Sequence, residues 1–153
     1  PLTKILQDES PWVRRAAADA LGTIASQEGL PALLEALDDE HMLVRASIAS
    51  ALGHMDHPRA RAALVKLTRS PDPELCWRAA LGLGRIGDAG ALAPLALLLD
   101  DEYVLFGRSI AQVAQRSIKA IESRERGLIG CVRRRLHSIR AFRRHKPIRP
   151  RRD

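Results

Sequence analysis

The sequence predicts an all-α protein, an α-solenoid of about four antiparallel helix pairs with a 31-residue period. The first observation is the stretch VRRAAADALG at 13–22, which returns as VRASIASALG at 44–53, as LCWRAALGLG at 75–84 and, more weakly, as FGRSIAQVAQ at 106–115. The second is composition, since 46% of the 153 residues are hydrophobic but only 3% are aromatic. Small aliphatic side chains suit closely packed helices, and a fixed period of this size indicates stacked repeats.

The first helix of each repeat has clear start signals. Ser10-Pro11 and Asp72-Pro73 each place an N-cap residue before a proline in the first turn, where a missing N–H costs nothing. Apolar residues from Val13 to Ile24 follow helical spacing and predict one buried face. A glycine near the helix end recurs at the same register, and we interpret this as close helix approach at Gly22, Gly53 and Gly84.

The second helix of each repeat is predicted to begin after an N-cap at Ser26, His57 or Asp88. Leucines such as Leu33 and Leu37 give it a buried face. We expect antiparallel pairs at 11–25 with 28–37, 42–55 with 58–69, and 73–86 with 88–99, then helices at 103–121 and 124–143. The column Leu21, Leu52 and Leu83 should be buried between helices. The opening residues align with the end of a second helix, so the first repeat is predicted to be truncated, with further repeats before it.

A change in charge divides the chain into three predicted parts. Residues 1–123 carry 13 basic and 16 acidic side chains, a net charge of −3, whereas residues 124–153 carry 12 and 2, a net charge of +10. We therefore expect a solenoid over 1–123, a basic amphipathic capping helix over 124–145 and a disordered basic tail over 146–153. The apolar stripe of the capping helix is predicted at Leu128, Val132, Leu136 and Ile139.

Three interpretations of the basic end stay open. Its arginines form a solvated helix face, bind nucleic acid or another polyanion, or meet an acidic protein partner. The candidate anion-binding residues are Arg133, Arg134, Arg140, Arg143 and Arg144.

The repeated segments resemble a known family. VRRAAADALGTI and VRASIASALGHM are similar to the first helix of HEAT-like repeats of the phycobilisome-lyase type, and GLPALLEALDD is similar to the second helix and linker. The resemblance covers about residues 1–121 and implies a curved solenoid that binds proteins, with some members assisting bilin attachment to phycobiliproteins. The Val-Arg pair of the first two repeats becomes Leu75-Cys76 and then Phe106-Gly107. Any Asp–Arg ladder between repeats should therefore break after the second repeat.

The sequence offers little sign of catalysis. Some HEAT-like enzymes hydroxylate a modified lysine with two irons held by His-Glu pairs, but the matching places here are Arg15-Ala16, Ala46-Ser47 and Trp77-Arg78. We interpret His54, Asp56 and His57 as helix-capping or solvent-exposed residues and not as a metal site. We interpret Cys76 as a core residue and not as a nucleophile. No phosphate-binding or dinucleotide-binding motif occurs. We therefore expect no catalytic, metal or cofactor site.

The expected function is protein binding without catalysis, by a scaffold or adaptor that uses the concave face. The second helices are predicted to line that face. Their outward side chains change from acidic to basic to apolar along the array, and the candidate partner-binding residues are Glu28, Glu35, Arg59, Lys66 and Leu97. A subunit of a bilin lyase or related maturation factor is one alternative, and a nucleic-acid-binding solenoid is another. The two cysteines fit no metal motif or disulfide framework, and no apolar run is long enough to span a membrane, so a cytoplasmic protein is expected.

Overall fold

The computed structural model describes the backbone of residues 2–144 and the side chains of residues 2–127. Helices dominate this part of the chain, and a short β-hairpin precedes the last one. The elements are α1 (Leu2–Ile5), α2 (Pro11–Ile24), η1 (Gln27–Gly29), α3 (Leu30–Glu35), η2 (Ala36–Asp38), α4 (Met42–Leu52), α5 (Pro58–Leu67), α6 (Pro73–Ile86), η3 (Ala89–Ala91), α7 (Leu92–Ala96), β1 (Val104–Leu105), β2 (Arg108–Ser109) and α8 (Ile110–Arg144), where η marks a 3-10 helix.

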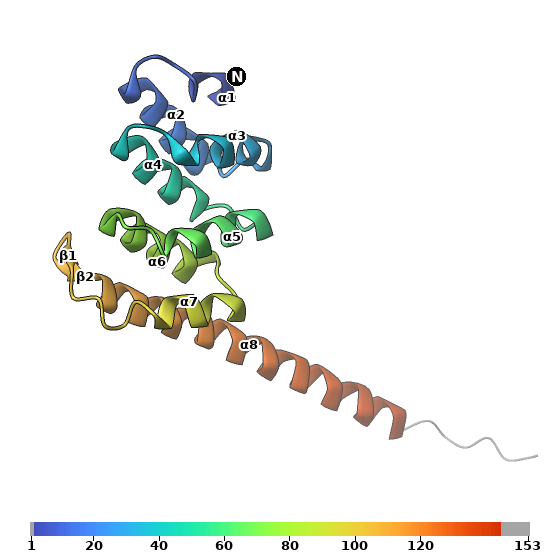
Figure 1. Cartoon of the computed structure of the whole chain (residues 1–153). Helices are drawn as coiled ribbons and strands as arrows, with labels where there is room; N and C mark the ends of the chain where they lie inside the picture. The colour runs from blue at the N-terminus through green and yellow to red at the C-terminus, as the bar shows by residue number, and fades with distance from the viewer. Residues whose placement is uncertain (1, 145–153) are drawn as a thin grey trace, which may run out of the picture.

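The helices form a two-layered stack, which confirms the predicted all-α solenoid (Figure 1). The first helices α2, α4 and α6 pack on one another in order, and α8 packs on α6. The second helices α3, α5 and α7 form the other layer. Since each pair contacts mainly its neighbours, the molecule is built as a linear array.

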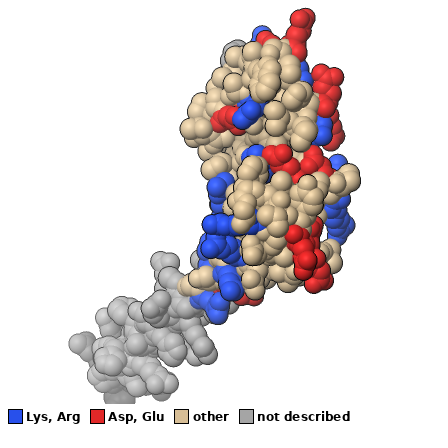
Figure 2. Space-filling model, turned by 90° about the vertical axis from the view of Figure 1, so that its left-hand side faces the viewer, with Lys and Arg blue, Asp and Glu red and all other residues tan. Residues whose placement is uncertain are grey.

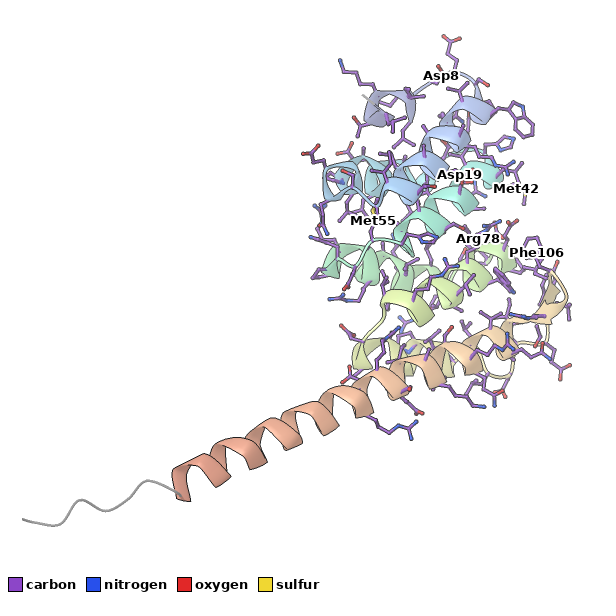
Figure 3. All side chains as sticks on the ribbon, turned by 180° about the vertical axis from the view of Figure 1, so that it is seen from behind. Asp8, Asp19, Met42, Met55, Arg78 and Phe106 are labelled. Atoms are coloured by element: carbon purple, nitrogen blue, oxygen red, sulfur yellow. The ribbon has the colours of Figure 1, made fainter. Side chains whose placement is uncertain are left out.

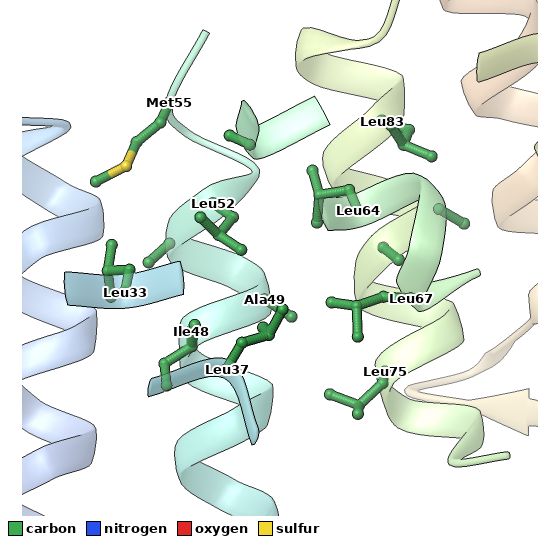
Figure 4. Close-up of a cluster of buried hydrophobic side chains, with 14 of the residues drawn as sticks. Leu33, Leu37, Ile48, Ala49, Leu52, Met55, Leu64, Leu67, Leu75 and Leu83 are labelled. Carbon is green, nitrogen blue, oxygen red and sulfur yellow. The ribbon is translucent and has the colours of Figure 1, made fainter. Parts of the chain in front are cut away.

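The core lies between the two layers. Leu52 and Leu83 are fully buried and Leu21 is 4% exposed, so the predicted leucine column is confirmed. Figure 4 shows Leu52 and Leu64 facing each other between the layers. The predicted apolar face of α2 is only partly right, because Val13 is 38% and Ile24 is 61% exposed. The buried face of α2 is instead made of Arg14, Ala17, Ala18, Leu21 and Gly22, and helical spacing places Val13 and Ile24 at the edge of that face.

The recurring glycines mark the places where first helices come closest. A Cβ atom at Gly22 would lie 2.7 Å from Ala51 Cα, and one at Gly53 would lie 2.8 Å from Gly82 Cα. In both cases the neighbour is 29 positions further on. A Cβ atom at Gly84 would instead lie 2.9 Å from Ser117 Cβ. The spacing seen at Gly22 and Gly53 predicts a neighbour about one helical turn before Ser117. Helix α8 is therefore shifted by one turn relative to the repeat pattern.

The second helices are shorter than the sequence predicts. Helices α3 and α7 each begin with a 3-10 turn, and α3 also ends in one. Two of the three predicted caps are confirmed, because the side chains of His57 and Asp88 accept hydrogen bonds from backbone N–H groups two residues later. Ser26 precedes η1, but its side chain makes no capping hydrogen bond. Early prolines and glycines in these segments favour tight turns over long regular helices.

The fourth repeat departs most from prediction. The first part of the predicted helix at 103–121 is an antiparallel hairpin, in which Val104 pairs with Ser109 and Leu105 with Arg108. Its two-residue turn has positive φ at both Phe106 (51°) and Gly107 (76°), a conformation that fits hairpins and excludes an α-helix. Phe106 is consequently 68% exposed, unlike Val44 and Leu75 at the same register.

The last two predicted helices are one continuous helix. Helix α8 runs from Ile110 to Arg144, so the predicted boundary between residues 123 and 124 falls inside it. Arg124 ties it to the end of α6 by donating hydrogen bonds to the carbonyl oxygens of Gly84, Arg85 and Gly87. The side chains of the predicted capping stripe and the tail over 146–153 lie outside the described residues.

Candidate functional site

The predicted partner-binding residues lie on the layer of second helices. Glu28 belongs to η1, Glu35 ends α3, Arg59 and Lys66 lie on α5, and Leu97 follows α7. All five side chains are exposed, and Leu97 is 70% exposed. The face therefore presents a row of solvent-accessible side chains from three successive repeats.

Two grooves separate the elements of this face. The first, of about 240 Å³, lies between α1 and α3 and includes Glu35 and Asp38. The second, of about 590 Å³, lies between η2 and α5 and includes Asp38, Lys66 and Arg69. The rim thus changes from acidic to basic along the array. The structure brings Glu35 and Lys66 into neighbouring grooves, whereas Glu28, Arg59 and Leu97 line neither of the two.

A buried ion pair holds the first two repeats together. Arg14 donates to both carboxylate oxygens of Asp39, at 2.7 Å from Nε and 3.0 Å from Nη2, and both side chains are less than a tenth exposed. Arg14 Nη1 also donates to the carbonyl oxygens of Asp8 and Glu9. This charge-assisted bidentate geometry is the strong kind of ion pair. This pair was not predicted from the sequence, although Arg14 and Asp39 both stand at repeated registers.

The same arrangement is already weaker at Arg45 in the second repeat, earlier than the predicted break after that repeat. Arg45 Nη1 donates to the carbonyl oxygens of Asp39 and Glu40, and its Nη2 lies 3.8 Å from an Asp72 oxygen. In the third repeat Cys76 takes the arginine position. Its Sγ lies 3.1 Å from the carbonyl oxygen of Ser70. A thiol replaces a guanidinium there, so no arginine of that register can continue the ladder.

The pKa shifts follow from these contacts. Burial alone would raise the pKa of Asp39, but hydrogen bonds from the Arg14 side chain and the His41 backbone, together with their charges, bring that pKa below its usual value. The Asp39 carboxylate in turn raises the pKa of Arg14. Burial raises the pKa of Cys76, and the negative charge of Asp101 adds to this. The thiol therefore stays protonated and unreactive at neutral pH.

The histidine cluster divides among different partners. His57 caps α5, Asp56 pairs with Arg61, and His54 Nε2 lies 3.1 Å from Arg85 Nη1. Burial, and then the charge of Arg85, lowers the pKa of His54. Within residues 2–127 no group of three or more His, Cys, Asp and Glu side chains could hold a metal ion. The predicted capping role of His57 is confirmed.

The predicted anion-binding arginines are on the last part of α8, and their side chains lie outside the described residues. They are Arg133, Arg134, Arg140, Arg143 and Arg144. No described helix is both long and apolar enough to cross a membrane.

The repeats match a known family over most of their length. The pattern of HEAT repeats fits the chain twice, over residues 1–74 and over residues 31–116. The chain belongs to the HEAT-repeat family. This agrees with the resemblance seen in the sequence, in which helix pairs stack with a 31-residue period.

Three solved structures share the HEAT-repeat fold. A chain of the CpcE–CpcF complex of phycocyanin lyase from Nostoc sp. PCC7120 superposes with a TM-score of 0.69 at 26% identity, over 78% of this chain and 52% of that one. Human deoxyhypusine hydroxylase in complex with glycerol superposes with a TM-score of 0.68 at 23% identity, over 82% of this chain and 44% of the hydroxylase. An engineered protein superposes with a TM-score of 0.53 at 27% identity, over 80% of this chain and 61% of the engineered one.

A curated relative contradicts one prediction. A segment of 51 residues, 33% of this chain, is 45% identical to deoxyhypusine hydroxylase from Eremothecium gossypii and spans 16% of that protein. The prediction that the chain is not an enzyme is therefore wrong, because the curated relative that matches this segment is an enzyme. The chain spans about half or less of the length of its natural relatives. None of these likenesses supports the nucleic-acid-binding alternative.

Proposed function

We propose that this chain is the HEAT-repeat part of a heteromeric enzyme of the bilin-lyase type, and that the face of its second helices binds the partner subunit. The observation that carries the proposal is the likeness to a chain of the CpcE–CpcF complex, over 78% of this chain. That protein is itself a complex of two chains. An equivalent assembly here would need an exposed face with shape and charge to match a partner.

The layer of second helices has the required features. Its two grooves carry opposite charge at Glu35 and Lys66, with Asp38 shared between them. Alternating charge along an interface favours one register and one partner over others. Exposed Leu97 adds an apolar contact at the far end of the same face. These features support a partner surface that extends over three repeats.

Partner capture tests this proposal. The full-length protein would be purified from its own cells, and its partners identified by mass spectrometry. We expect a second subunit of the lyase type to co-purify, and we expect loss of that subunit in the variant that combines Glu28→Ala, Glu35→Ala, Arg59→Ala and Lys66→Ala.

The matched control removes the same charges elsewhere. Arg15, Asp19, Glu122 and Arg126 are exposed, include two acids and two bases, and lie on α2 and α8. Their replacement by Ala should leave the subunit bound. Equal retention by both quadruple variants would contradict the proposed face, and a partner unrelated to lyases would contradict the proposed enzyme class.

Deoxyhypusine hydroxylase activity is a second candidate, which the 45% identity over 51 residues favours. The places that match the His-Glu pairs of two-iron HEAT-like enzymes hold Arg15-Ala16, Ala46-Ser47 and Trp77-Arg78, so residues 2–127 do not supply that ligand set. An assay of the full-length protein on a deoxyhypusine-bearing protein separates the candidates, because turnover there would replace the lyase proposal.

A further inference from the structure

A second candidate surface lies on the layer of first helices, away from the proposed partner face. It is a groove of about 310 Å³ between α6 and α8, and most of its wall is apolar. Its lining includes Trp77, Leu81, Val113, Arg85, Arg108 and Arg116. A volume of this size accommodates one or two side chains of a bound protein segment.

The three arginines of this groove lack acidic partners in the described part of the chain. Arg85, Arg108 and Arg116 are exposed, and none of the ion pairs formed within residues 2–127 includes them. Arg78 on the same helix as Arg85 is, by contrast, paired with Glu74 at 2.7 Å. Figure 2 shows basic side chains gathered at the lower left of the described surface. The groove therefore offers positive charge that an acidic partner would neutralise.

An exposed aromatic side chain forms the edge of this surface. Phe106 is 68% exposed, and its ring stands edge-on to Trp77 with the ring centroids 5.2 Å apart. Arg78 Cζ lies 5.9 Å from the centroid of the Phe106 ring, and Figure 3 shows Arg78 on α6 and Phe106 at the hairpin. Tyr103 and Val104 are also more than half exposed. A bulky residue with positive φ is uncommon and costs conformational energy, and such positions concentrate at functional surfaces.

The indole N–H of Trp77 is an unmet hydrogen-bond donor in this region. It is buried and has no acceptor among the described residues. A buried donor without an acceptor is energetically unfavourable. Because this nitrogen has no surface open to a partner, the binding surface in the groove is the indole ring of Trp77 and not its N–H.

We propose that the groove between α6 and α8 binds an acidic segment of a partner protein. An apolar side chain of that segment sits against Trp77 and Phe106, while its carboxylates pair with Arg85, Arg108 and Arg116. Clustered aromatic and arginine side chains are typical of the residues that dominate protein interfaces. Nucleic acid would use the arginines but would leave the apolar wall unfilled, so the combination favours protein. This inference concerns the other layer of the stack and does not depend on the proposed enzyme class.

Fluorescence of Trp77 provides a direct test with the full chain. The Trp12→Phe variant leaves Trp77 as the single tryptophan, since the sequence contains two. The probe is a synthetic helical peptide of about 18 residues without tryptophan, with Glu and Leu on one face. We expect saturable binding that changes Trp77 emission. We expect no binding when Lys replaces the Glu residues, and weaker binding when Ala replaces the Leu residues.

Matched arginine variants assign the binding to the groove. The combination of Arg85→Gln, Arg108→Gln and Arg116→Gln should weaken binding by about tenfold or more, as expected for close charge pairs. Phe106→Ala should weaken it without changing the charge. Replacing Lys4, Arg15 and Arg126 with Gln removes the same charge from exposed positions outside the groove and should have little effect. Circular dichroism would verify that each variant remains helical.

Three outcomes would overturn the inference. They are equal loss in both triple variants, equal binding of the Lys peptide, and binding of a short duplex DNA through the groove arginines with no binding of the acidic peptide. Because the second-helix variant of Glu28, Glu35, Arg59 and Lys66 leaves this groove intact, failure here and failure of the proposed function are distinguishable.

Discussion

Arg14 and Cys76 stand at the same register two repeats apart, yet they stabilise their repeats differently. Arg14 bridges repeats through Asp39 and through two carbonyl oxygens. Cys76 keeps the equivalent carbonyl contact, at Ser70, and also lies 3.6 Å from the carbonyl oxygens of Leu67 and Thr68, but it forms no ion pair. The sequence predicted that the ladder would break at Cys76, because residue type alone decides whether a guanidinium is present. It did not predict the Arg14–Asp39 pair, since that requires knowing how two helices approach.

The Arg14–Asp39 pair predicts how stability depends on pH. Because the folded-state pKa of Asp39 is lowered from about 3.8, the pair contributes stability above that pH and loses it as pH falls through the lower folded value. In Asp39→Asn this contribution is absent. We expect urea unfolding to show a free-energy difference between wild type and Asp39→Asn that is constant near neutral pH and shrinks below about pH 4. A difference that stays constant down to pH 2 would contradict the ionised pair.

Leu52 tests the core at the centre of the array. It is fully buried between the layers, so Leu52→Ala removes packing that surrounding helices cannot easily replace. The free energy of unfolding should fall by about 2–5 kcal/mol. Leu97→Ala is the control, because Leu97 is 70% exposed and its loss should change stability by less than about 0.5 kcal/mol. Equal denaturant midpoints for Leu52→Ala and wild type would show that the face was assigned wrongly.

At the scale of elements, the 31-residue period predicted the helix pairs but not the fourth repeat. The period placed Phe106 with Val44 and Leu75 inside a helix. Gly107 permits a positive φ, and the short hairpin it allows moves the start of the next helix to Ile110. Helix α8 then packs one turn out of register, so that Ser117 meets Gly84. Periodicity cannot reveal such a shift, because one helical turn preserves the apolar face.

The contact between α4 and α6 gives a prediction at the same scale. A Cβ added to Gly53 would lie 2.8 Å from Gly82 Cα, a backbone atom that cannot move without shifting α6. Gly53→Ala should therefore lower the free energy of unfolding by about 1–3 kcal/mol. Gly127→Ala is the matched control on α8. Nothing lies within 4 Å of its added methyl group, so helix propensity should raise stability by about 0.5–1 kcal/mol. Stabilisation by both changes would contradict the close approach.

At the scale of the whole molecule, the sequence predicted the exposed side chains of the second-helix layer better than the grooves between them. The outward register correctly identified exposed side chains from Glu28 to Leu97. It could not show that Glu35 and Lys66 line neighbouring grooves, because groove shape depends on the short 3-10 segments between repeats. It also missed the groove of Trp77, because the hairpin that carries Phe106 was predicted as helix. The residue patterns did suggest HEAT-like enzymes, but the absence of His-Glu pairs at Arg15-Ala16, Ala46-Ser47 and Trp77-Arg78 led to the wrong prediction that the chain is not an enzyme.

Hydrogen–deuterium exchange of the full-length protein would show whether the layer of second helices binds the partner subunit. Amide exchange would be compared for the free protein and for the complex with the subunit that co-purifies. We expect slower exchange on binding over the second-helix layer, which comprises residues 27–38, 58–67 and 89–97, and little change over α2 and α4. Identical exchange of the second helices in the free and bound protein would contradict the proposed partner face.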